Sequence, residues 1–176
     1  MARARAAVRG GATVVQLRLK HADARTLVDV GRALVAALPV PVIVNDRADV
    51  ALACGAAGVH LGADDVPVAA LRHVCPPPFV IGASVRADTA GADYVGIGPV
   101  FSTDSKSDAP EAIGIAGFVA LRARSTAPAV AIGGITAEHC AALRQAGAVG
   151  VAVIAAIFGT ADPEAAARAI RAAWRR

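Results

Sequence analysis

Three polar side chains stand at alternate positions directly after the first valine-rich segment of the sequence: Gln16, Arg18 and Lys20. Alternate residues of an extended strand face the same side, so two cations and one amide would share a surface. Such a group suits the binding of a phosphate or carboxylate anion. The alternative is a solvated strand end, with the three side chains pointing into water.

Carboxylates follow the next two valine-rich segments. Asp46 comes directly after Asn45, and Asp64 and Asp65 come shortly after His60. Beside phosphate-binding cations, carboxylates serve as Mg2+ ligands that bridge to phosphate oxygens. Each could instead cap the following helix, because Asp is a preferred N-cap residue. Two separate segments supply carboxylates near one basic group, and this pairing favours a metal site.

Hydroxyl and glycine residues follow the later segments. Ser84 ends the fourth, and residues 98–108 after the fifth form a polar loop with Lys106 among hydroxyl groups, suited to wrap a diphosphate. Residues 133–136 begin with two glycines, whose bare N–H groups at a helix start suit a phosphate. The seventh segment runs directly into a short helix at Ala155. The pattern as a whole indicates phosphorylated small-molecule substrates.

Two kinds of buried strand alternate along the chain. Four follow a Gly-Ala turn at residues 11, 55, 91 and 147, and three follow a proline at 41, 78 and 128. Helical periodicity fills most gaps, as in residues 24–38, 137–146 and 163–174. Alternating strands and helices predict a single α/β domain over residues 1–176, a TIM (β/α)8-type barrel. The strand ends, and the polar residues that follow them, then meet at one mouth.

Two parts of the expected barrel are incomplete. An eighth strand would have to precede residues 2–9, and the sequence does not supply it. Residues 84–93 leave room for about one helical turn, where an average helix has about three. We therefore expect a barrel lacking its first strand and with a shortened fifth helix. No GxGxxG motif follows the first strand, which argues against a dinucleotide-binding fold.

The composition excludes several function classes. The chain has 176 residues, a formal charge of +4, 56% hydrophobic and 3% aromatic residues. So few aromatic residues argue against nucleic-acid binding, and no unbroken apolar run could span a membrane. The three cysteines and four histidines lack metal or disulfide spacing. We expect a cytoplasmic protein without nucleic-acid or membrane partners.

The sequence resembles the thiamine phosphate synthase family in seven motifs that occur in the family's order. They are VQLRLK, VNDRADVALA, GVHLGADD, GADYVGIGPVF, STDSK, AIGGIT and GVAVIAAIF. The resemblance implies a transferase that uses Mg2+. It would couple 4-amino-2-methyl-5-hydroxymethylpyrimidine diphosphate to 4-methyl-5-(2-phosphooxyethyl)thiazole and release diphosphate. The expected mechanism is a dissociative substitution.

The resemblance also implies a role for each matching residue. Asp46 and Asp65 would bind Mg2+, and Ser84 and Lys106 would be catalytic. The substrate-binding positions would be Gln16, Arg18, Lys20, Asn45, Ser84, Thr103, Ser105, Lys106, Gly134, Ile154 and Ala155. The first five of these, with Lys106, would contact the pyrimidine diphosphate, and the others the thiazole phosphate. Ala63, Ser102 and Ala155 depart from the usual glutamine, proline and serine of the family.

Two other functions stay open from the sequence. One is a thiazole tautomerase, an isomerase of the same superfamily that tends to have a histidine in place of Pro99 and often lacks the metal-binding aspartates. Asp46, Asp65 and Pro99 therefore favour the synthase. The other is a non-catalytic ligand-binding barrel, suggested by the missing elements. Exposed strand edges would also favour a homo-oligomer.

Overall fold

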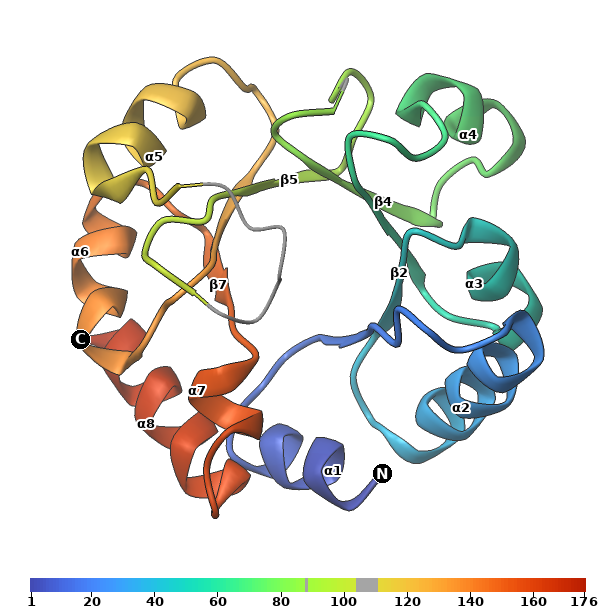
Figure 1. Ribbon diagram of the computed structural model, residues 1–176, viewed down its shortest axis with the longest axis horizontal. Helices are drawn as coiled ribbons and strands as arrows, with labels where there is room; N and C mark the ends of the chain where they lie inside the picture. Colours follow the sequence, from blue (N-terminus) through green and yellow to red (C-terminus); the bar gives the residue numbers. More distant parts are fainter. Residues whose placement is uncertain (88, 104–110) are drawn as a thin grey trace.

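Seven parallel strands form one curled sheet in the computed structural model, which describes residues 1–87, 89–103 and 111–176. The strands lie side by side in chain order, and each pairs in parallel with the next. Figure 1 shows the sheet curling around a central axis with the helices outside it. The strands are β1 Val15–Leu17, β2 Val42–Asn45, β3 Gly58–Leu61, β4 Val80–Ser84, β5 Tyr94–Ile97, β6 Ala129–Ile132 and β7 Gly150–Ala152.

Helices occupy most of the connections between strands. Asp23 caps the longest of them, accepting a hydrogen bond from the N–H of Thr26 at 2.8 Å. The helices are α1 Ala2–Arg9, α2 Ala24–Ala37, α3 Ala48–Cys54, α4 Val68–Val74, α5 Gly114–Arg122, the 3-10 helix η1 Ala137–His139, α6 Cys140–Gln145, α7 Ala155–Phe158 and α8 Pro163–Arg175. None of the described helices is long and apolar enough to cross a membrane.

The sheet has an outer face against the helices and an inner face toward the barrel axis. Val42 and Val44 of β2 pack in one buried cluster with Leu27 and Leu34 of α2, so they define the outer face. Strand residues alternate between faces, which places Asn45 on the inner face. The same alternation gives the inner face its polar residues: Gln16, Asn45, His60, Ser84 and Tyr94.

The sheet is open between its first and last strands. No pairing joins β1 to β7 within the described residues, and the flanking Val14 and Val149 are 51% and 58% exposed. The helices outside the sheet cover the opening between β1 and β7, because α1 packs against α8 (Figure 1). The described residues thus form seven parallel strands of the predicted (β/α) barrel.

Two interactions fix α1 on α8. Arg9 forms an ion pair with Glu164 at 2.7 Å. Gly10, at the end of α1, lies so close to α8 that an added Cβ would come 2.3 Å from the carbonyl oxygen of Glu164. A side chain at position 10 would therefore force the two helices apart.

The connection from β4 to β5 has no helix in its described part, residues 85–87 and 89–93. An ion pair between Arg72 and Asp93 stabilises the end of this connection. Asp93 accepts hydrogen bonds from Arg72 at 2.5 Å and from the N–H of Ile81 at 2.7 Å. The predicted shortening of the fifth barrel helix is thus confirmed. Hydrogen bonds of Asp93 join α4 and β4 to the segment just before β5.

Candidate active site

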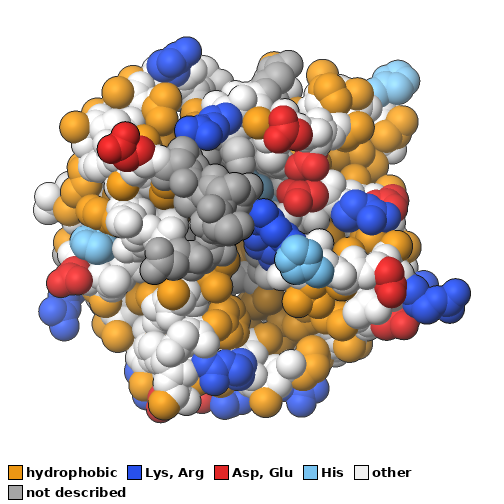
Figure 2. Space-filling view, in the orientation of Figure 1, with side chains coloured by type: hydrophobic (Ala, Val, Ile, Leu, Met, Phe, Trp, Pro, Cys, Tyr) orange, Lys and Arg blue, Asp and Glu red, His pale blue; other side chains and the backbone are white. Residues whose placement is uncertain are grey.

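A cavity opens at the carboxyl ends of β1 and β2. Lys20, Asn45, Asp46 and Arg47 line it together with apolar side chains of β1, α2 and the loop between them, and its volume is about 190 Å³. Figure 2 views the mouth of the barrel, where basic and acidic side chains lie side by side near a hollow with hydrophobic walls. Two cations, an amide and a carboxylate therefore line one cavity at the predicted end of the barrel.

The chain reaches this cavity from β1 through a loop. Gln16 is exposed on the inner face of β1, but the strand ends at Leu17. Strand alternation therefore does not set the directions of Arg18 and Lys20, contrary to the sequence-based expectation. Arg18 is half-buried, and Lys20 reaches the cavity from the loop that precedes α2.

Asp46 has an unusual backbone conformation. It is the one described non-glycine residue with a positive φ, at 64°. The N–H of Arg47 donates to the carbonyl oxygen of Asn45 at 2.8 Å, which closes a tight turn with Asp46 at its centre. Left-handed backbone in a non-glycine residue costs free energy and is found preferentially at functional sites. The turn directs Asp46 to the cavity.

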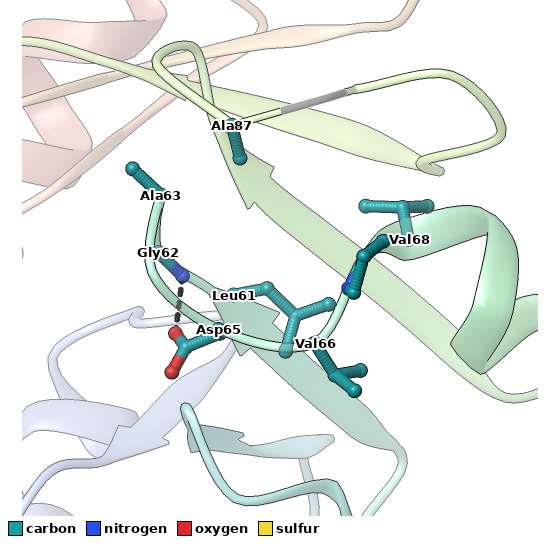
Figure 3. A pocket seen from close by; sticks show the side chains of 8 residues that line it. Leu61, Gly62, Ala63, Asp65, Val66, Val68 and Ala87 are labelled. Atoms are coloured by element: carbon teal, nitrogen blue, oxygen red, sulfur yellow. Dashed lines mark hydrogen bonds between the residues drawn. The ribbon is translucent and has the colours of Figure 1, made fainter.

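The N-cap alternative does not hold for either proposed metal ligand. The N-cap residue of α3 is Arg47, without a side-chain capping bond, and that of α4 is Pro67. Asp65 instead accepts a hydrogen bond from the N–H of Gly62 at 2.6 Å, within the loop after β3 (Figure 3). This bond fixes the Asp65 carboxylate beside a second, smaller cavity lined by Ala63 and Ala87.

The donor set fits Mg2+ bound partly by substrate. Among the described residues, no three His, Cys, Asp or Glu side chains gather as a ready metal cage. Mg2+ does not need one, because it is held by one or two carboxylates, waters and substrate phosphates. Asp46 and Asp65 follow the neighbouring strands β2 and β3 and could supply those two carboxylates.

A polar network crosses the inner face from β3 to β5. His60 Nδ1 lies 3.0 Å from the hydroxyl of Tyr94, and His60 Nε2 lies 3.4 Å from the hydroxyl of Ser84. Burial raises the pKa of Tyr94 to about 12, so its hydroxyl keeps its proton at neutral pH. Ser84, the predicted catalytic hydroxyl, is therefore held in a chain of hydrogen-bonding groups.

The opposite side of the mouth is built from β5, β6 and the segments after them. The N–H of Phe101 donates to the carbonyl oxygen of Gly133 at 3.1 Å. Gly134 has φ 64°, and an added Cβ would lie 2.3 Å from the carbonyl oxygen of Ser102. This close approach brings the residue before Thr103 next to Gly134.

The structure describes two of the four remaining predicted residues of this side. Ile154 and Ala155 are exposed at the start of α7, after β7. Ser105 and Lys106 lie outside the described residues. The described site thus has its cations and carboxylates at β1–β3 and its glycine turn at β6.

The sequence did not predict two features of the site. One is the part that Tyr94 and His60 play on the inner face, and the other is the stacking of Phe101 on His139, with ring centroids 3.7 Å apart. The first had a usable signal, because Tyr94 and Gly96 share the face opposite the buried Val95 and Ile97. The stacking of Phe101 on His139 joins residues far apart in sequence, and no sequence pattern indicates it.

Comparison with known proteins gives a consistent result. A family model described as thiamine monophosphate synthase matches residues 1–157. A thiamine-phosphate synthase from Methanoculleus marisnigri is 49% identical, with 96% of this chain and 84% of that protein covered. One from Desulfitobacterium hafniense is 44% identical, covering 97% of this chain and 87% of the relative.

Solved structures agree with the fold. Thiamine phosphate pyrophosphorylase from Pyrococcus furiosus superposes with a TM-score of 0.85 at 35% identity, covering 99% of this chain and 88% of that one. A 3-hexulose-6-phosphate synthase has a TM-score of 0.76 at 20% identity, covering 98% of this chain and 91% of that one, a likeness of fold alone.

Proposed function

Because the chain belongs to the thiamine monophosphate synthase family, we propose that the mouth of its barrel joins hydroxymethylpyrimidine diphosphate to thiazole phosphate. The chain is a transferase, a thiamine-phosphate synthase like its relatives. The names of these relatives favour the synthase over the tautomerase and over a non-catalytic barrel. The observation that carries the site assignment is the meeting of Lys20, Asn45 and Asp46 at one cavity.

The cationic side of the cavity suits the diphosphate. Lys20 supplies a point charge and Asn45 an amide donor at the end of β2. Gln16 and Arg18 stand on the same side of the mouth, at and just beyond β1. Charge-assisted hydrogen bonds to phosphate oxygens are stronger than neutral ones, so this side would hold the leaving group. Lys106 would add a further cation.

Asp46 and Asp65 would hold Mg2+ next to this diphosphate. When bound, Mg2+ neutralises charge on the phosphate oxygens and so makes diphosphate a better leaving group. Asp46 is presented by its left-handed turn, and Asp65 by its bond to Gly62. Both carboxylates are therefore positioned by the protein before any ligand binds, which lowers the cost of ordering them.

The glycine turn after β6 would receive the thiazole phosphate. Gly134 lets the backbone approach the segment before Thr103. Ile154 and Ala155 are exposed at the start of α7. Thr103 and Ser105 would add hydroxyl contacts. Ala155 has no side-chain hydroxyl, so only its backbone N–H could donate to the phosphate.

The reaction requires little proton transfer. The bond between the pyrimidine methylene carbon and the diphosphate oxygen breaks, and the oxygen keeps the electron pair. The thiazole nitrogen then gives its lone pair to the same carbon. The residues contribute by positioning the two substrates and stabilising the departing charge, and Ser84 with Lys106 would act closest to the reacting groups.

Binding of the pyrimidine diphosphate in the presence of Mg2+ tests the site assignment. Lys20→Ala should weaken binding about tenfold or more by titration calorimetry, since a charged hydrogen bond contributes about 1.5–3 kcal/mol. The matched control is Arg25→Ala, an exposed cation in the first turn of α2. Wild-type affinity in the Lys20 variant would place the diphosphate elsewhere.

The cellular location and the oligomeric state of the enzyme are also proposals. We infer a cytoplasmic enzyme, because Cys54, Cys75 and Cys140 are all free and buried and a reducing compartment keeps thiols in that state. We further infer a homo-oligomer, because the open edges at β1 and β7 offer unpaired backbone groups to a second copy. Sedimentation at micromolar concentration that shows only monomer would remove the second inference.

A further inference from the structure

The ring of His60 lies between two hydroxyl groups and beside one glycine, and a second glycine lies under the neighbouring Tyr94 ring. Its Nδ1 lies 3.0 Å from Tyr94 Oη, and its Nε2 lies 3.4 Å from Ser84 Oγ. An added Cβ at Gly96 would lie 3.0 Å from the Cε1 atom of His60, and one at Gly82 would overlap the ring of Tyr94. The two glycines thus leave the space that lets both rings reach across the inner face.

The direction of the hydrogen bond between Tyr94 and His60 follows from the requirement that the Tyr94 hydroxyl proton have an acceptor. Tyr94 is partly buried, and burial keeps its hydroxyl protonated, so the proton needs an acceptor. His60 Nδ1 is the acceptor that the described residues place beside it. If Nδ1 instead carried a proton, the tyrosine proton would lose this acceptor, and an unsatisfied buried donor is costly.

The tautomer of His60 then determines whether the hydroxyl of Ser84 donates or accepts. A neutral imidazole has one N–H, so acceptance at Nδ1 places the proton on Nε2. The Nε2–H faces Ser84 Oγ, which accepts this bond at 3.4 Å. The proton of the serine hydroxyl remains available for another acceptor.

We propose that Tyr94 is a positioning residue that acts through His60 to hold the hydroxyl of Ser84 as a hydrogen-bond donor toward the substrate. The substrate atom that meets Ser84 is then an acceptor, a ring nitrogen or a phosphate oxygen, and not an amino group. The contact with substrate rests on the proposed function, because that function places Ser84 in the substrate site. The order of protons in the free protein does not rest on it.

The first test needs no substrate. Nitrogen-15 NMR of the histidine rings in the ligand-free protein should show His60 as the Nε2–H tautomer. In Tyr94→Phe, which keeps the ring over Gly82 but lacks the hydroxyl, this preference should weaken. A wild-type His60 with its proton on Nδ1 would overturn the inference and leave the proposed function standing.

The second test is a double-mutant cycle between Tyr94→Phe and Ser84→Ala. Tyr94→Phe should raise KM for the pyrimidine diphosphate about tenfold, the effect of one hydrogen bond. In the Ser84→Ala background the same change should have little further effect, because both remove one chain of contacts. Equal, additive losses would show that Tyr94 acts apart from Ser84 and would overturn the inference.

A merely structural effect is separated by the melting temperature of each variant. The inference predicts that the KM effect persists in a Tyr94→Phe protein that melts like the wild type. If Ser84→Ala leaves KM and kcat unchanged while the His60 tautomer is as predicted, the placement of Ser84 in the proposed site is wrong, and the substrate part of the inference is overturned with it.

Discussion

The backbone N–H of Asp46 donates a hydrogen bond to the carbonyl oxygen of His60 at 2.8 Å. This bond continues the pairing of β2 and β3 one residue beyond the register of Asn45 with His60. It anchors the tight turn at Asp46 to the strand that carries the inner-face histidine. The proposed metal ligand and the Tyr94–His60–Ser84 network are therefore built on the same pair of strands.

Substitution of Asp46 should separate stability from activity. Asp46→Gly relieves the backbone strain at φ 64°, so the free energy of unfolding should stay within about 1 kcal/mol of wild type or rise. Asp46→Ala keeps the strain and should leave the fold nearly intact. Both should lose Mg2+-dependent turnover by on the order of 100-fold, because a metal contributes several kcal/mol to charge stabilisation.

Asp49 supplies the matched control for Asp46. It is an exposed carboxylate three residues away that pairs with Arg47. Exposed pairs contribute about 0–1 kcal/mol, so Asp49→Ala should change neither melting nor turnover appreciably. Full Mg2+-dependent activity in Asp46→Ala would refute the assignment of Asp46 to the metal.

Gly134→Ala should disturb the glycine turn after β6, the proposed site of the thiazole phosphate. The new Cβ meets the carbonyl oxygen of Ser102 at 2.3 Å in a left-handed backbone. Gly55→Ala is the control, with φ 72° and no atom within 4 Å. Both should lose about 1–2 kcal/mol to the backbone conformation, and Gly134→Ala about 1–3 kcal/mol more to overpacking. Denaturant melts that give equal losses would show that the two segments can move apart freely.

The cap of α2 should depend on pH. The backbone hydrogen bond from Thr26 lowers the pKa of Asp23 below 3.8. A depressed carboxyl pKa stabilises the folded state above the unfolded pKa, and this contribution is lost as pH falls through the folded value. Asp23→Ala should therefore lower Tm at pH 7 and differ little from wild type once the carboxyl is protonated.

Asp23→Asn completes this test. An amide oxygen can still accept from the N–H of Thr26, so the cap persists without a charge. The variant should keep most of the Tm at pH 7 and lose the part of the acid sensitivity that comes from Asp23. Identical pH profiles for the wild type and both variants would mean that the cap does not contribute to stability.

The ion pair beneath the short β4–β5 connection should matter more than exposed pairs do. Asp93 accepts from both Arg72 and the N–H of Ile81. Asp93→Ala removes both bonds and should cost about 1–3 kcal/mol in urea unfolding. Asp49→Ala again serves as the control. A loss no larger than that of the control would show that the turn does not depend on this carboxylate.

The sequence predicted the parts of the fold that depend on local rules. The expected Gly-Ala turns are present, with positive φ at Gly11, Gly55, Gly91 and Gly147. The helix predicted for residues 24–38 is α2 Ala24–Ala37. These features follow from backbone freedom and periodicity, which a single sequence records. The seven-stranded order followed from their alternation.

Features that depend on contacts between strands could not be predicted in the same way. The left-handed turn at Asp46 depends on its bond to His60, 14 positions further along the chain. The nesting of the Tyr94 ring over Gly82 depends on the register of β4 with β5. The register between two strands determines which of their side chains meet. The alternation of residues in the sequence predicts only which face of the sheet each side chain occupies.

The most direct measurement is the coupling reaction itself. Purified protein is given hydroxymethylpyrimidine diphosphate and thiazole phosphate, with Mg2+ or with a chelator, and thiamine phosphate is followed by chromatography. The account predicts product with Mg2+, little product with the chelator, and little product from Asp46→Ala in either condition. A folded protein that forms no thiamine phosphate with Mg2+, or forms it equally well with the chelator, would contradict the account.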